Sequence, residues 1–119
     1  MQDRRKKLGN FGEDLATSFL KRKGYRIIDR NFRTKFGEID IICEKQGKIV
    51  FVEVRTKSND TFGIPEESIN ARKKQKLALM ADFYLTAKKL WEKPYSLDGV
   101  FIEEKNGEYE IRHLEDMLG

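Results

Sequence analysis

Two short apolar runs, residues 39–43 and 49–54, constrain the fold of this chain more than any other feature of its sequence. Both runs are rich in β-branched residues, which favour strands. Residues 45–48 between them, Lys-Gln-Gly-Lys, are typical of a hairpin loop. The sequence therefore predicts a hairpin of two apolar strands near the middle of the chain.

Helices and further strands are predicted on both sides of this hairpin. Asn10 is expected to cap a helix in which Glu13 is the third residue and which Gly24 ends. A second, long helix is expected from Glu66 to about Trp91, because apolar residues recur there with helical period. Its predicted apolar stripe consists of Ile69, Leu77, Met80, Tyr84, Ala87 and Trp91.

The order of the predicted elements indicates the fold class. A strand over residues 25–29 precedes the hairpin, and a second hairpin over residues 97–102 and 109–113 turns at Asn106-Gly107. The order is therefore α-β-β-β-α-β-β. No internal repeat or Pro/Ser-rich linker interrupts residues 1–119. The sequence predicts a single domain of α/β class.

The charges indicate a candidate partner. The chain carries 24 Lys and Arg against 20 Asp and Glu, a formal net charge of +4. Basic clusters of this kind can neutralise nucleic-acid phosphates, but they also occur on solvated helix faces. Both interpretations remain open. The clusters lie at residues 4–7, 21–23, 30–35 and 72–76.

The remaining composition excludes several classes of protein. Cys43 is the only cysteine, so an intramolecular disulfide and a cysteine-rich zinc site are excluded. Burial explains Cys43 better than nucleophilic catalysis. His113, the only histidine, is expected on the surface of its strand, and Asp98 has no assigned role. Because neither a signal peptide nor a membrane span can be recognised, we expect a soluble cytoplasmic protein without a membrane partner.

Two acidic residues interrupt the apolar runs. If Glu44 pairs with Ile49, Asp40 lies directly opposite Glu53 on one face of the hairpin. A register shifted by two residues makes them diagonal neighbours instead. Opposed carboxylates destabilise a sheet unless their charge is neutralised. Mg²⁺, which prefers oxygen ligands, would neutralise the pair, and so would Arg55 with neighbouring basic side chains.

The sequence around these acids resembles a nuclease family. Residues 37–40, Gly-Glu-Ile-Asp, followed by residues 51–55, Phe-Val-Glu-Val-Arg, resemble the active-site hairpin of the PD-(D/E)XK nuclease superfamily. That resemblance implies a restriction-endonuclease-like core, a mixed β-sheet flanked by helices. Over about residues 8–102 the chain also resembles the YraN-like bacterial proteins, which are similar to archaeal Holliday-junction resolvases. The motifs concerned are Gly12-Glu13, Gly24-Tyr25-Arg26-Ile27, Arg30-Asn31-Phe32-Arg33 and Phe62-Gly63 with Pro65.

The resemblance implies roles for particular residues. Asp40 and Glu53 become ligands of Mg²⁺ or Mn²⁺, and the backbone carbonyl of Val54 becomes another. Glu13 would complete the acidic site, although it is equally placed to form a capping box with Asn10.

Positive charge near the acids departs from the superfamily pattern, because Arg55 stands where a lysine is usual. Arginine keeps its proton and supplies only a fixed charge, which can still stabilise charge on a phosphate. Lys73 lies on the apolar stripe of the long helix and either extends along the core toward the sheet edge or joins the site. Lys57 lies two residues beyond Arg55, and Glu38 is expected to pair with Arg55 across the strands.

The preferred interpretation is a metal-dependent nuclease that hydrolyses phosphodiester bonds in DNA, including branched DNA. The alternative is a nucleic-acid-binding module with a nuclease fold and little or no activity. An interaction protein with a basic surface is a third class. DNA is preferred over RNA through the resemblance alone, which also implies a homodimer.

Overall fold

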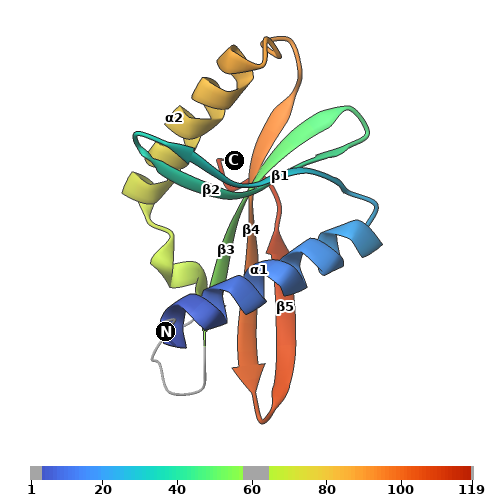
Figure 1. Ribbon diagram of the computed structural model, residues 1–119, viewed down its shortest axis with the longest axis vertical. Coiled ribbons are helices and arrows are strands. Elements are labelled where there is room, and N and C mark those ends of the chain that lie inside the picture. The colour runs from blue at the N-terminus through green and yellow to red at the C-terminus, as the bar shows by residue number, and fades with distance from the viewer. Residues whose placement is uncertain (1–3, 58–64, 119) are drawn as a thin grey trace.

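The computed structural model describes residues 4–57 and 65–118, with side chains from residue 10 onward. Phe62-Gly63 of the family motif therefore lies outside the described residues. The predicted order α-β-β-β-α-β-β is confirmed, with one short 3₁₀ helix added (Figure 1). The elements are α1 (Arg4–Arg22), β1 (Arg26–Thr34), β2 (Gly37–Lys45), β3 (Lys48–Lys57), the 3₁₀ helix η1 (Pro65–Ser68), α2 (Ala71–Ala87), β4 (Tyr95–Lys105) and β5 (Glu108–Leu114).

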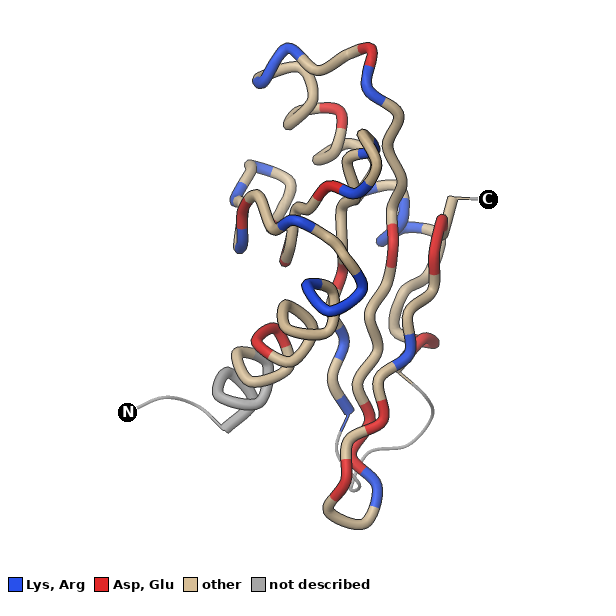
Figure 2. The backbone as a smooth tube through the Cα atoms, turned by 90° about the vertical axis from the view of Figure 1, so that its right-hand side faces the viewer, with Lys and Arg blue, Asp and Glu red and all other residues tan. Residues whose placement is uncertain are grey.

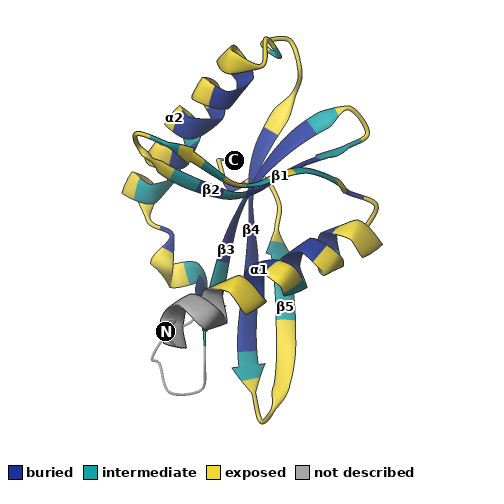
Figure 3. Cartoon of the chain, in the orientation of Figure 1, coloured by how far each residue is buried: buried dark blue, intermediate teal, exposed yellow. Residues whose placement is uncertain are grey.

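The five strands form one mixed sheet in the order β1-β2-β3-β4-β5. β3 and β4 are parallel, whereas the other neighbouring pairs are antiparallel. A parallel pair requires a crossover connection, and this connection contains α2. Figure 3 shows that buried positions follow the central strands β3 and β4, while much of β5 at the sheet edge is exposed.

Each face of the sheet has its own core because alternate strand residues point to opposite sides. Phe51 packs on the α2 side, and Val52 packs on the α1 side. The two helices therefore flank the sheet, in agreement with the restriction-endonuclease-like core implied by the resemblance. Of the two helices described, neither is both long and apolar enough to cross a membrane. The helix residues that pack in the two cores are Leu77, Met80 and Tyr84 of α2, and Ala16 and Leu20 of α1.

The central hairpin has the predicted register but a shorter turn. Glu44 pairs with Ile49, as expected. Lys45 and Lys48, which were expected in the loop, also pair. Gln46 and Gly47 make the turn with φ of 52° and 80°, a left-handed pair that matches the twist of the strands.

The first helix begins earlier than predicted. α1 starts at Arg4, so Asn10 and Glu13 lie inside the helix and the predicted capping box is wrong. The preceding arginines, lysines and leucine have good helix propensity and extend the helix. Its end is as predicted, because Gly24 has φ of 92° and the Tyr25 N–H donates to the Leu20 carbonyl at 3.0 Å.

The second helix is shorter than predicted at both ends. It begins at Ala71, where the Asn70 side chain caps it by accepting from the Lys73 N–H at 2.9 Å. It ends at Ala87, and Lys89 takes the left-handed conformation that glycine usually supplies at this position. Trp91 therefore lies beyond the helix and is 64% exposed, which corrects its predicted place in the apolar stripe. Ala87 is exposed as well, whereas Leu77, Met80 and Tyr84 are buried as predicted.

A close approach at Gly12 fixes α1 against β3. A Cβ atom at this position would lie 2.0 Å from Thr56 Oγ1 and 3.3 Å from Thr56 Cβ. Only glycine therefore fits between the helix and the strand here. The next residue, Glu13, is held beside the sheet as a consequence.

Replacing Gly12 with alanine is expected to destabilise the protein in a denaturant titration. Overpacking costs about 1–3 kcal/mol, and because the approach to Thr56 Oγ1 is as close as 2.0 Å we expect the upper part of this range, above the gain of about 1 kcal/mol from helix propensity. Thr56→Ala in the same chain removes Oγ1 and should recover part of the loss. A Gly12→Ala protein as stable as the wild type would show that the helix shifts without cost.

Candidate metal centre

The regular pairing of β2 with β3 ends beside the two acids of the central hairpin. The last regular pair is Ile41 with Val52, so Asp40 and Glu53 would form the next one. Instead, the Val54 N–H donates to Asp40 Oδ2 at 2.7 Å. The Asp40 side chain therefore joins the strands where the backbone ladder has ended.

Glu53 is a buried carboxylate with one oxygen paired and one unpaired. Its side chain is 3% exposed, and Oε1 lies 2.9 Å from Arg55 Nη1 and 3.7 Å from Lys73 Nζ. Lys73 thus extends from α2 to the acid pair, which was one of its two expected placements. Within the described part of the chain, Glu53 Oε2 has no hydrogen-bond partner. A buried anion with a free oxygen is a potential cation ligand.

Two further carboxylates, Glu13 and Glu38, lie together with Asp40 on the α1 side. Oxygen atoms of Glu13, Glu38 and Asp40 all lie within 4.8 Å of one another. The Asn31 amide nitrogen donates to Glu13 Oε1 at 2.8 Å and to Glu38 Oε1 at 2.7 Å, in the amide orientation that hydrogen bonding requires. Asn31 therefore holds two acids in place with one side chain.

Asn31 and Glu38 were not predicted as site residues. Asn31 lies across from Asp40 because β1 continues to Thr34, beyond the predicted end at Asp29. It has φ of 56°, a conformation that asparagine tolerates better than most residues. Asn31 belongs to the family motif Arg30-Asn31-Phe32-Arg33, but no spacing indicated this contact. Glu38, however, alternates with Asp40 along its strand, which was a usable signal.

The expected pairing of Glu38 with Arg55 is wrong. Arg33 Nε lies 3.2 Å from Glu38 Oε2, and Arg55 pairs with Glu53 instead. The regular ladder ends at Ile41, so Glu38 does not oppose Arg55 in the sheet.

Burial and mutual repulsion raise the pKa values of the acids. Burial is the larger cause at Glu53, and the Asp40 charge adds to it, so the pKa rises to about 7 despite Arg55 and Lys73. The pKa of Glu13 also rises to about 7, first through burial and then through Asp40. Burial raises the pKa of Asp40 itself. The neighbouring basic side chains therefore do not fully offset the burial and mutual repulsion of these acids.

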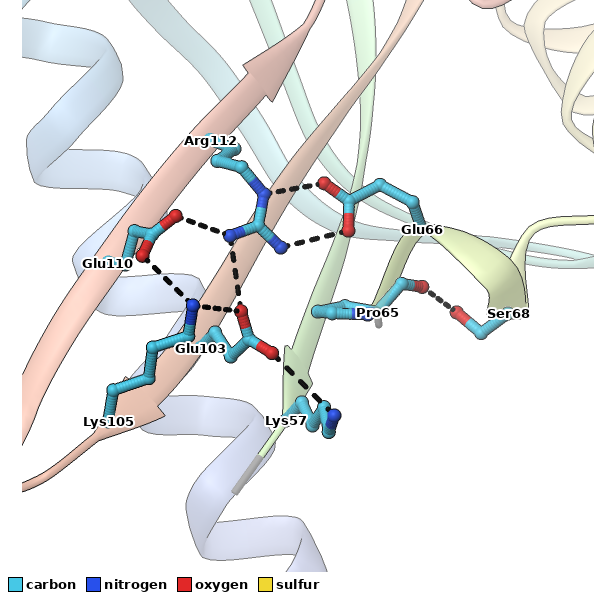
Figure 4. A network of polar contacts seen from close by, with 8 residues as sticks. All are labelled: Lys57, Pro65, Glu66, Ser68, Glu103, Lys105, Glu110 and Arg112. Atoms are coloured by element: carbon cyan, nitrogen blue, oxygen red, sulfur yellow. Dashed lines mark hydrogen bonds and ion pairs between the residues drawn. The ribbon is translucent and has the colours of Figure 1, made fainter. Parts of the chain in front are cut away.

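Lys57 belongs to a different polar network. Its Nζ lies 3.6 Å from Oε1 of Glu103, its partner in the parallel pairing. Figure 4 shows Glu103 beside Arg112, which also makes two hydrogen bonds of 2.7 and 3.0 Å to Glu66. The network therefore attaches η1, just before α2, to β5.

The side chain of His113 is buried rather than on the surface, which corrects the expectation. Its side chain is 3% exposed, and Nε2 lies 2.8 Å from Asp98 Oδ2. Nδ1 lies 2.6 Å from Lys23 Nζ, and an ammonium group can only donate, so Nε2 carries the ring proton. Asp98 also accepts from the Asp116 N–H at 3.0 Å. The pair thus fastens the C-terminal segment to β4, while Cys43 is buried as expected.

These features define an α/β protein with a mixed sheet, helices on both faces and a candidate metal centre at the end of its central hairpin. The family model described as "Uncharacterised protein family UPF0102" matches residues 12–103. The chain belongs to this family, which confirms the resemblance to the YraN-like proteins.

Relatives that carry the same family name align along most of their length. A UPF0102 protein of Syntrophomonas wolfei is 42% identical over 109 residues, covering 92% of this chain and 95% of the relative. One from Desulforamulus reducens is 40% identical, with 99% and 100% covered. One from Persephonella marina is 47% identical over 98 residues, with 82% and 84% covered.

The raised pKa of Glu53 predicts how the metal-free protein responds to pH. Between about pH 4.5 and 7 the folded state keeps a proton that the unfolded state has released, so stability falls as pH rises through this range. Glu53→Gln removes the ionisation and should stabilise the protein by about 1–3 kcal/mol at pH 8, but little at pH 5. Urea unfolding with a chelator present measures both values.

Glu44→Gln is the matched control, because hydrogen bonds from Arg26 and Lys93 lower the pKa of this acid instead. It should not stabilise the protein at pH 8. An equal effect of Glu53→Gln at both pH values would contradict the raised pKa.

Proposed function

We propose that this protein is a metal-dependent phosphodiesterase that cleaves DNA, with Asp40 and Glu53 as ligands of Mg²⁺ or Mn²⁺. The observation that carries this proposal is the buried Glu53 Oε2 atom, for which the described residues provide no partner. Its desolvation is unfavourable, and a hard cation with oxygen ligands would remove the penalty. Glu13 and the Val54 carbonyl complete the proposed donor set.

The basic residues beside the acids have distinct proposed roles. A bound divalent cation would supply an activated water and polarise a phosphoryl oxygen. Arg55 holds Glu53 through Nη1 at 2.9 Å and supplies a fixed positive charge for the developing negative charge on phosphorus. Lys73 brings a second positive charge from α2, on the same carboxylate oxygen. It thereby offsets the absence of a lysine at position 55.

The alternative is a nucleic-acid-binding module that keeps this fold without activity. Its support is that Arg55 and Lys73 already contact Glu53 Oε1 and partly neutralise it. This contact does not account for the buried Oε2 atom, which has no partner among the described residues, so we prefer the interpretation that the protein is an enzyme.

Glu53→Gln tests the metal centre directly. Wild-type protein should be stabilised by Mg²⁺ or Mn²⁺ in thermal unfolding, by about 2.7 kcal/mol at one hundred times the dissociation constant. The variant should lose this response and all cleavage of junction, flap and single-stranded DNA, but should keep its DNA affinity. Glu44→Gln makes the same change at an acid of β2 outside the proposed site. This variant should keep both the metal-induced stabilisation and the DNA cleavage.

The outcomes separate the two functions. Cleavage that survives Glu53→Gln would show that the site is elsewhere. Wild-type protein that binds DNA but shows neither metal-induced stabilisation nor cleavage would be the binding module. Arg55→Lys restores the usual lysine and is expected to preserve the metal response.

A basic pocket beside the acids supports a nucleic-acid substrate. Figure 2 shows Lys and Arg positions on both helices and several turns, interleaved with acidic ones, so net charge alone does not define a binding face. At the start of α2, however, lies a pocket whose described lining residues are all basic or neutral polar. Lys73 connects it to Glu53. The lining residues are Ser68, Asn70, Arg72, Lys73 and Lys76.

Removing positive charge from this pocket should weaken DNA binding for all sequences alike, since phosphate contacts carry no sequence information. Arg72→Ala with Lys76→Ala should also reduce the slope of log affinity against log salt by about 2. Lys88→Ala with Lys89→Ala, at the other end of α2, is the control of equal charge. Binding by the wild type that does not change with salt would refute the electrostatic interpretation.

A further inference from the structure

Three side-chain atoms are buried without a hydrogen-bond partner in the part of the chain that the structure describes: Arg30 Nε, Glu53 Oε2 and Arg55 Nε. An unsatisfied buried polar group costs about 1–3 kcal/mol, and charged groups cost more. Such groups are few in folded proteins, and a bound ion is one reason for them. The site thus needs partners of both signs, a cation for Glu53 and an acceptor for the two guanidinium groups.

Arg30 lies beside the acids on the α1 side of the sheet. It pairs with Ile41 in the sheet, so it is adjacent to the position across from Asp40. Its Nη2 donates to Asp14 Oδ1 on α1 at 2.9 Å, which fixes the guanidinium group. Its charge lowers the pKa of Glu13, in keeping with this placement.

Arg55 lies on the opposite side of the same centre. Its Nη1 atom is held by Glu53, which also contacts Lys73 of α2. The acids are therefore flanked by one guanidinium group from each side, each anchored through a terminal nitrogen and each with an unsatisfied Nε–H.

The other arginines of the described part of β1 do not share this feature. Arg33 has a side chain that is 85% exposed, and its Nε is paired with Glu38. Arg26 is 68% exposed and is paired with Glu44. Arg30 has a side chain that is 34% exposed, and it is therefore distinguished by its buried, unpaired Nε atom and not by its charge.

We propose that Arg30, with Arg55, binds a phosphodiester anion over the acidic centre, so that the anion and a divalent cation complete the site together. This inference rests on the proposed function and names the group that the site recognises. Guanidinium donors match phosphate oxygens in geometry and form charge-assisted hydrogen bonds with them. Phosphate oxygens also ligate hard cations, so one ligand meets both requirements.

The test uses dimethyl phosphate, a phosphodiester monoanion, titrated into the full chain with saturating Mg²⁺ and followed by backbone amide NMR shifts. Wild-type protein should bind it, and Arg30→Gln should weaken binding at least about tenfold, the loss of one charge-assisted hydrogen bond. Arg30→Lys keeps the charge without the Nε–H and should also bind more weakly. Arg26→Gln, on the same strand, should stay within about twofold of wild type.

The readouts distinguish failure of this inference from failure of the proposed function. If Mg²⁺ shifts the resonances but Arg30→Gln and wild type bind dimethyl phosphate equally, the role of Arg30 is refuted while the metal centre stands. If Mg²⁺ does not shift the amide resonances of the wild-type protein, the proposed metal centre is refuted, and the inference that rests on it is refuted as well. If acetate binds as well as dimethyl phosphate, the assignment to a phosphodiester is overturned. The amide spectrum of each variant reports directly whether the variant is folded. If Arg30→Gln does not fold, Arg30→Lys is used for the same comparison with the wild type.

Discussion

The parallel pairing of β3 with β4 is the constraint on which the rest of the structure depends. It places β3 in the middle of the sheet, where both faces of the strand are covered along residues 49–54, so a polar residue there, such as Glu53, loses contact with water. It also requires a crossover, which lays α2 on one face and brings Lys73 to Glu53. The burial of Glu53 and the charge that partly offsets it therefore have one origin.

The end of the β2–β3 ladder then gives the site its composition. Asp40 uses its carboxylate to bind the Val54 N–H, and it stands between Glu53 on the α2 side and the Glu13–Glu38 pair on the α1 side. Asn31 supplies two donors to these acids but no charge. The result is a concentration of acidic groups whose negative charge is incompletely compensated by the surrounding residues of the described chain.

Two polar networks away from the acids keep the surrounding elements in place. Arg112 ties Glu66 of η1 to β5 and so fixes the segment that leads into α2. The Asp98–His113 pair attaches the C-terminal segment to the centre of the sheet. Both networks join residues distant in sequence. Neither could be inferred from local patterns, and for this reason His113 was expected on the surface.

Local sequence patterns determined the kinds of elements, their order and the register of the central hairpin. Glu44 pairs with Ile49 because β-branched runs and a glycine-containing turn permit few other registers. The helix ends were less well determined, since α2 stops at a left-handed lysine where no glycine marks the position.

Tertiary structure alone decided which side chains share the acidic centre. The sequence singled out candidates but not their common environment; the candidates were Asp40, Glu53, Arg55, Glu13, Lys73 and the Val54 carbonyl. Asn31 and Arg30 joined them because β1 extends past its apolar part and pairs with β2, a contact whose energy comes from the neighbouring strand and not from the residues' own propensities. Raised pKa values and unsatisfied atoms likewise exist only after folding removes these groups from water.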